Sequence, residues 1–274
     1  GVGLPTDLWI PATKKLPPQK AWIASLGGVY DLERIASTLS IEGYYRESKG
    51  NIMYREGASY MSVDDLAGHA DRYWEEKVTR GSSWSTGVEF LLQRKVGKFT
   101  GWIGYTLSWT RVRFNELNAG KSFWATYDRR HDISVVAMYR FNERWRAALT
   151  WVYGTGNAFT LPQTLLSNRA RPDEPSDNIA ADYIDYGEMN GMRMGASHRL
   201  DLGVQWVKKF KRVEQIVSFD IYNAYARRNP FFYMIERNEP TILDYGYLGS
   251  SANYSLKKFS LFPLIPSISY TLNF

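Results

Sequence analysis

Cysteine is absent from this sequence of 274 residues. A chain without thiols cannot form a disulfide framework, a thiolate zinc site, an iron–sulfur cluster or a cysteine nucleophile. Long apolar runs are also missing, because glycine, serine, threonine or a charge interrupts every apolar stretch. A membrane-spanning helix needs roughly 18 to 20 consecutive apolar residues. The sequence therefore excludes a helical membrane protein.

Histidine is scarce, and its 3 residues, His69, His131 and His198, lack the spacing of metal ligands. Ser134 lies near His131, but their parity in a strand places the two side chains on opposite faces, without an acid to orient the histidine. Carboxylates gather in one loop without the spacing of a calcium site. They are Asp173, Glu174, Asp177, Asp182, Asp185 and Glu188. We expect a solvated acidic loop, no enzyme activity, no metal and no cofactor.

Aromatic residues are abundant instead, at 15% of the chain, with 10 Trp, 19 Tyr and 13 Phe. A soluble domain would have to bury most of these rings or give them a ligand, whereas a lipid interface accommodates them. The net charge is +6, but basic residues are spread along the chain and acids accompany them. This distribution favours a solvated surface over a nucleic-acid partner.

Apolar and polar residues alternate with a period of two along most of the chain. From Phe99 to Trp109 the odd positions are mostly apolar, and the even positions between them are mostly small and polar. This pattern predicts strands with one apolar and one polar face. About nine segments are long enough for the roughly 9 to 11 residues of a membrane strand. They span residues 20–32, 34–47, 82–95, 98–114, 130–141, 144–159, 197–210, 213–234 and 255–274.

The connections between these strands alternate between two kinds. Tight turns are expected at 31–34, 96–97, 142–143 and 211–212, and long polar loops at 48–81, 115–129, 160–196 and 235–254. Aromatic residues gather near the strand ends. Short turns at one end, long loops at the other and aromatic girdles are typical of an antiparallel transmembrane β-barrel. An odd number of strands beginning on the outside predicts one piece of a larger barrel, because open edges in lipid are costly.

Several segments resemble the TonB-dependent outer-membrane receptors. The tail FPLIPSISYTLNF, which ends at Phe274, resembles their closing strand. HRLDLGVQW (198–206) and VSFDIYNAYARRNPFF (217–232) resemble the preceding strands, and GLPTDLWIP (3–11) followed by PPQKAW is similar to a mid-barrel segment. The segment GLPTDLWIP with PPQKAW resembles the receptors of the branch that carries an N-terminal carboxypeptidase-regulatory-like domain. The order of the motifs carries the resemblance more than any single motif.

The resemblance implies an all-β barrel of about 22 strands around a plug. Residues 1–274 would then form its C-terminal part, with the plug and TonB box on the N-terminal side. It implies import of a scarce nutrient across the outer membrane of a Gram-negative bacterium. The implied partners are outer-membrane lipid and lipopolysaccharide, the rest of the barrel, the plug, the TonB complex and a surface lipoprotein lid. Phe274 matches the terminal assembly signal of this family.

Two sets of residues are candidates for function. Charges on the polar strand faces would line a wet lumen or contact a plug, because they are costly against lipid. They are Glu42, Arg46, Glu89, Arg140, Arg146, Asp201 and Asp220. Loop aromatics are candidates for binding a ligand, with self-packing of the loops as the alternative. They are Trp74, Trp124, Tyr127, Tyr183 and Tyr186. Lys257 and Lys258 suit lipopolysaccharide phosphates or form a solvated pair.

Two other classes of protein stay open at this point. One is a non-transporting barrel that docks surface lipoproteins or a secretion apparatus. The other is a soluble β-rich adhesin or carbohydrate-binding module, in which a second sheet would bury the apolar face. The assigned faces predict that Leu107→Arg or Leu149→Arg blocks membrane assembly, whereas Thr106→Arg is tolerated.

Overall fold

The computed structural model describes residues 11–55, 74–161, 164–167, 182–185, 187–238 and 253–274. These segments are built almost entirely from antiparallel strands and short turns. The helices within them are single 3-10 turns, and none is long and apolar enough to cross a membrane.

One large antiparallel sheet dominates the structure. Its nine main strands are neighbours in the order in which they occur along the chain, and β5 (Phe123–Trp124) pairs with β4 beside this path. The nine are β1 (Lys20–Leu32), β2 (Ser37–Tyr54), β3 (Val78–Arg94), β4 (Phe99–Phe114), β6 (His131–Arg140), β7 (Trp145–Gly154), β12 (Ser197–Lys209), β13 (Glu214–Tyr222) and β16 (Ile265–Asn273). The predicted all-β antiparallel class is confirmed.

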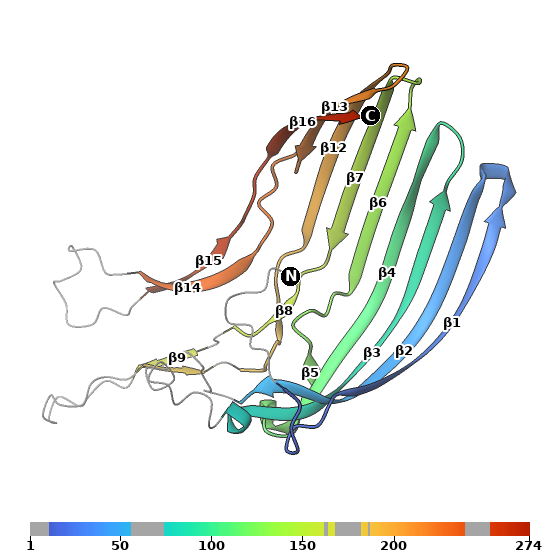
Figure 1. Ribbon diagram of the computed structural model, residues 1–274. Coiled ribbons are helices and arrows are strands. Elements are labelled where there is room, and N and C mark those ends of the chain that lie inside the picture. The colour runs from blue at the N-terminus through green and yellow to red at the C-terminus, as the bar shows by residue number, and fades with distance from the viewer. Residues whose placement is uncertain (1–10, 56–73, 162–163, 168–181, 186, 239–252) are drawn as a thin grey trace, which may run out of the picture.

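Three small ladders lie beside this sheet. They are β8 (Ala158–Phe159) with β11 (Met192–Arg193), β9 (Thr164–Ser167) with β10 (Asp182–Asp185), and β14 (Phe232–Asn238) with β15 (Asn253–Phe259). Figure 1 shows the sheet as a curved wall with these ladders near one of its two ends.

Short and long connections lie at opposite ends of the wall. Figure 1 shows the links β1–β2, β3–β4, β6–β7 and β12–β13 at the end that also holds the C-terminus. We call this the turn end and the other the loop end. Three turns match the predicted positions, and the first lies at 33–36 where 31–34 was predicted. In the β3–β4 turn Gly97 adopts a φ of +99° that favours glycine. Alternation of short and long connections is thus a property of the fold.

Strand register gives the sheet one continuous apolar face and one polar face. On β4, Leu107 lies directly opposite Val88 of β3, while Thr106 lies opposite Glu89, so the two sets never mix. We name the side of Thr106 the polar face and the side of Leu107 the apolar face. Leu26 and Ile268, both on the apolar face, are 85% and 76% exposed. An apolar surface of this extent indicates contact with lipid or with another protein.

Aromatic rings border the apolar face at both ends. At the turn end, Phe99 lies opposite Tyr139, and Trp145 lies opposite Trp206. At the loop end, the rings of Trp22 and Tyr45 are 5.4 Å apart between centroids. On β4 the bordering rings, Phe99 and Trp109, lie ten residues apart, which is about 34 Å along an antiparallel strand and about 24 Å across a layer at a 45° tilt. This height matches the apolar band of a membrane barrel, about 25 Å.

The two lateral edges of the sheet are open. β1 and β16 each pair with one neighbour, and no strand in the described part of the chain lies on their other side. Backbone groups along a free edge in hydrocarbon each cost several kcal/mol, so both edges require a partner strand in a membrane.

Some predicted strand bounds were wrong. The loop expected at 48–81 is shorter than predicted. β2 continues to Tyr54, and β3 already begins at Val78. The expected strand 144–159 ends at Gly154, and the expected strands 213–234 and 255–274 each divide in two. The last two breaks face each other across the pair β13–β16, at residues 223–231 and 260–264. Alternation is present on both sides of each break, so each pair of segments was interpreted as one strand.

Asn223 organises this break. Its backbone has a φ of +54°, and its side chain is 1% exposed. Its amide nitrogen donates to the carbonyl oxygens of Arg227 at 2.9 Å and Phe262 at 3.3 Å, and its Oδ1 accepts the Arg227 amide at 3.1 Å. Asp201 accepts the Asn223 amide at 2.9 Å. This network releases β14 and β15 from the sheet and aims them away from it at the loop end (Figure 1).

We expect Asn223→Ala to destabilise the protein by about 2–4 kcal/mol, because it leaves buried backbone groups unpaired and places alanine at a positive φ. Urea unfolding in lipid vesicles measures the change. Asn223→Gly separates the two causes, since glycine tolerates the backbone conformation but restores no hydrogen bond. An Ala variant as stable as the parent would show that the network does not hold the break.

Candidate functional site at the loop end of the polar face

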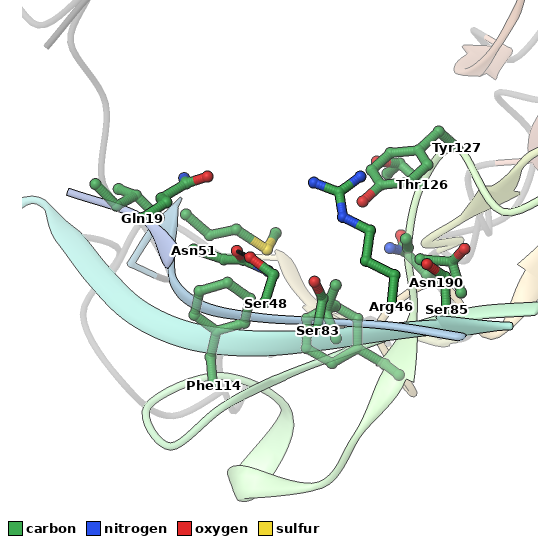
Figure 2. Close-up of a pocket in the computed structure, with 16 residues that line it drawn as sticks. Gln19, Arg46, Ser48, Asn51, Ser83, Ser85, Phe114, Thr126, Tyr127 and Asn190 are labelled. Atoms are coloured by element: carbon green, nitrogen blue, oxygen red, sulfur yellow. Dashed lines mark hydrogen bonds between the residues drawn. The ribbon is translucent and has the colours of Figure 1, made fainter. Parts of the chain in front are cut away.

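A cavity of about 330 Å³ lies on the polar face at the loop end. Its back wall is a cross-strand row, in which Arg46 of β2, Ser85 of β3 and Thr110 of β4 lie directly opposite one another. Ser48 and Ser83 form the next row. Figure 2 shows the Arg46 side chain extending into the cavity above these serines. The wall is therefore a hydroxyl-rich surface with one cation.

A bulge in β2 adds a further polar group to this wall. The pairing with β3 shifts by one residue between Lys49 and Asn51, and Gly50 in between has a φ of +80°. The extra residue reverses the parity of the strand, so Asn51 faces the same side as Ser48. The Ser48 hydroxyl donates to the Asn51 side-chain oxygen at 2.7 Å.

The floor of the cavity is apolar. Val112 and Phe114, at the end of β4, pack with Phe123 of β5, and the two phenyl rings lie 6.3 Å apart between centroids. Phe114 is only 1% exposed, because its ring lies over Gly81 of β3. A Cβ at Gly81 would meet this ring at 2.5 Å, so a side chain there would displace the floor.

The loop after β4 and a residue far along the chain close the far side. Thr126, Tyr127 and Asn190 line the cavity there. Asn190 is 5% exposed, and its amide nitrogen donates to the Trp124 carbonyl oxygen at 2.7 Å. Its backbone nitrogen donates to the Thr160 hydroxyl at 3.0 Å. Segments 66 positions apart in the sequence thus form one wall.

A buried ion cluster holds these loops against the sheet. The Asp128 side chain is fully buried, accepts the Thr110 amide at 2.5 Å, and pairs with Arg193 and, at 3.6 Å, with Arg130. Arg130 and Arg193 also lie over the Trp124 ring, at 4.9 and 5.3 Å from its centroid. Burial lowers the pKa of the Arg130 guanidinium, and Asp128 opposes this shift. Arginine nonetheless stays protonated at physiological pH, so the cluster is ionic.

The structure places the five predicted loop aromatics in different surroundings. Tyr127 lines the cavity and is 67% exposed. Trp124 lies under the guanidinium groups of Arg111, Arg130 and Arg193. Such contacts within the protein are those of the alternative in which the loops pack against themselves. Trp74 begins the short helix η4 (Trp74–Glu76) before β3. Tyr183 lies in β10, where only the backbone is described, and Tyr186 lies outside the described residues.

All seven predicted lumen charges lie on the polar face of the sheet, as the register shows. Glu42 and Glu89 are direct neighbours on β2 and β3, and Arg140 and Arg146 on β6 and β7. Asp201 also has a structural partner, since it accepts a hydrogen bond of 2.9 Å from Arg199. Asp220 lies opposite Gly203 of β12. Arg46 is the member of this set that lines the loop-end cavity.

A second hollow, of about 640 Å³, lies at the turn end and is basic. Lys95, Lys98, Arg140 and Arg146 line it, and the Arg140 amide donates to the Lys98 carbonyl oxygen at 2.8 Å. These four side chains have no acidic partner among the residues that the structure describes. Like charges directly opposite on neighbouring strands repel, as Arg140 and Arg146 do. An anionic group in the hollow would stabilise these side chains.

The described residues hold no group of three or more potential metal ligands. His131 contacts the Tyr105 hydroxyl at 2.9 Å, and His198 contacts the Tyr225 hydroxyl at 2.6 Å, on the apolar face. His69 and the acids at 173, 174 and 177 lie outside the described residues. Lys257 pairs with Glu236, and Lys258 donates to the Arg228 carbonyl oxygen at 3.3 Å. Both lysines therefore have partners within the protein.

Sequence reasoning missed Asp128, Arg193 and Asn190, which build the site across long sequence distances. No periodic pattern marks them, because Asp128 and Asn190 lie in loops and Arg193 ends the two-residue strand β11. One signal was present: Asp128, Arg129 and Arg130 form a short charged run beside a strand that is otherwise apolar on one face. Such a run is more often solvated, so the sequence gives no reason to expect a buried cluster.

Neither a protein-family model nor a curated protein sequence matches the chain. The geometry described above is that of a curved antiparallel sheet with one apolar and one polar face. A solved structure has a similar fold: the ferripyoverdine receptor of the outer membrane of Pseudomonas aeruginosa, bound to ferripyoverdine. The TM-score is 0.52 at 11% sequence identity, over 94% of this chain. The matched region covers 27% of the receptor chain, so this chain spans about a quarter of its length. At this identity the likeness concerns the fold.

Proposed function

We propose that this chain forms the C-terminal part of the barrel of a TonB-dependent receptor that imports a scarce nutrient across the outer membrane of a Gram-negative bacterium. The observation that carries the proposal is a sheet with one apolar face of membrane height, one polar face and two open edges. Further barrel strands satisfy both edges, lipid covers the apolar face, and a plug covers the polar face. The role is non-catalytic.

The full-length gene product tests this proposal in its native membrane. We expect it in the outer-membrane fraction, with a folded form that migrates faster than the heated form in gels. We also expect growth on its nutrient to require both this protein and TonB. A phenotype independent of TonB, with the protein still in the outer membrane, would favour the alternative of a docking barrel for surface lipoproteins. A product that folds without detergent would exclude both.

The basic hollow supports the plug as a partner. Arg140 of β6 and Arg146 of β7 lie directly opposite one another at the turn end, and Lys98 lies beside them in the β3–β4 turn, so these cations repel one another unless an anion separates them. The turn end is the periplasmic end in a barrel of this kind. We propose that carboxylates of the plug occupy this hollow and fix the plug against the wall.

We expect the double variant Arg140→Gln and Arg146→Gln to loosen the plug and make the outer membrane leaky. Sensitivity of cells to vancomycin, which the intact outer membrane excludes, should rise about tenfold. Lys208→Gln is the matched control, because it removes a cation from the turn end of the apolar face. Equal vancomycin sensitivity of the double variant and the parent would argue against plug contact at this hollow.

A further inference from the structure

Among the residues that the structure describes, Arg46 is the single charged side chain that lines the loop-end cavity. The other lining groups are hydroxyls, amides and apolar side chains, and no carboxylate is among them. Building on the proposed import function, we propose that this cavity binds a small solute that carries a carboxylate and several hydroxyl groups. Arg46 would bind the carboxylate, and the serine rows would bind the hydroxyls.

The charges around the cavity distinguish Arg46 from Arg55, Arg111, Arg130 and Arg193 at the loop end. Arg130 and Arg193 share Asp128, and Arg55 pairs with Glu116 at 3.3 Å. Arg111 donates to the Ser122 carbonyl oxygen at 2.9 Å. The Arg46 side chain, in contrast, has no ion pair or hydrogen bond within the described part of the chain. Its guanidinium is therefore available to a ligand, and its planar fork suits a carboxylate.

The hydroxyl groups are placed to select a polar solute. Ser83 and Ser85 lie on the same face of β3, two residues apart, and neither hydroxyl has a partner among the described residues. Ser48 and Asn51 already bond to each other at one end of this row, which fixes their orientation. A solute with hydroxyls at sugar-like spacing can exchange bonds with several of these groups, whereas an apolar acid would leave them unpaired.

The volume and the apolar floor of the loop-end cavity also suit such a solute. About 330 Å³ lies at the lower end of the range of ligand pockets, about 300 to 1,000 Å³, and suits a compact solute. Val112, Phe114 and Phe123 give one apolar side, on which the carbon face of a sugar ring can rest. Thr126 and Tyr127 stand beside Arg46 on the open side (Figure 2). Together these features fit a sugar acid better than a neutral sugar or an inorganic anion.

Titration calorimetry on the purified full-length protein in detergent tests the inference. The probes are D-glucuronate, D-galacturonate and D-gluconate, with D-glucose and D-galactose as the neutral counterparts. We expect at least one acid to bind and its neutral counterpart to bind at least about tenfold more weakly, as expected for loss of a charged hydrogen-bond pair. We expect Arg46→Gln to weaken binding of the acid by a similar factor and Arg46→Lys to weaken it less.

Lys49→Gln is the matched control, because it removes a cation three residues along the same strand, on the apolar face. It should leave binding unchanged, and heat-modifiable migration shows that each variant is folded. Failure of all three acids to bind, equal binding of acid and neutral sugar, or full binding by Arg46→Gln would each overturn the inference. Localisation and TonB-dependent growth do not involve these probes. If the protein passes those tests but binds no acid, the inference is overturned and the proposed function stands.

Discussion

Leu149→Arg in the full-length protein is expected to block assembly into the outer membrane. Leu149 lies on the apolar face of β7, opposite Ala137 and Leu202, and midway between Trp145 and Tyr153 on the same strand. An arginine at the midplane of a lipid-facing surface costs about 2–4 kcal/mol. The amount of heat-modifiable, folded protein in the outer-membrane fraction measures the effect.

Two neighbouring substitutions are the controls for this prediction. Thr106→Arg adds the same charge on the polar face, directly between Glu89 and Asp132, and should assemble normally. Leu107→Arg was also expected from the sequence to block assembly, but Leu107 lies only two residues from Trp109 at the loop-end border of β4, so we now expect its cost to fall towards about 1 kcal/mol. Equal folded yields for all three variants would contradict the faces assigned to the sheet.

Asp128→Ala is expected to release the loops that close the cavity. The substitution leaves the Thr110 amide and two guanidinium groups without their shared carboxylate. Breaking a buried ion pair costs about 3–5 kcal/mol. Because the Arg130 and Arg193 side chains are 21% and 30% exposed and can regain water, we expect about 3 kcal/mol. Hydrogen exchange at the Thr110 amide should accelerate about a hundredfold, since each 1.4 kcal/mol is a factor of ten.

Asp132→Ala is the control for the ion cluster. Asp132 pairs with Arg129 at 3.4 Å, with side chains 44% and 47% exposed, and such exposed pairs contribute about 0–1 kcal/mol. Proteolysis of the loops in intact cells should increase for Asp128→Ala and stay at the parental rate for Asp132→Ala. Unchanged exchange at Thr110 in Asp128→Ala would show that apolar packing alone holds the loops.

The strands were predictable because lipid-facing and water-facing residues alternate at the period of the backbone. β1, which was expected at 20–32, has the bounds Lys20–Leu32. Breaks within strands were harder to predict, because Asn223 and Phe262 adopt positive φ values within segments whose alternation continues on both sides. Their conformation is set by hydrogen bonds between the two segments, which a single stretch of sequence does not contain.

The candidate site was predictable only in part. Arg46 was identified because a charge on the polar side of a membrane strand must avoid lipid. Trp124 was a candidate for ligand binding, with self-packing of the loops as the alternative, and it lies under Arg111, Arg130 and Arg193. Loop residues carry no periodicity, so their partners follow from the path of the chain in space.

By itself, the sequence determined the class of structure: antiparallel strands, their two faces and the alternation of short turns with long loops. These features depend on local backbone geometry and on the solvent that each face meets. The tertiary structure alone decided which charges meet, because pairing brings Arg140 beside Arg146 and folding brings Asp128 to Arg193 across 65 positions. Electrostatic energy depends on distance in space, and distance along the chain does not determine it.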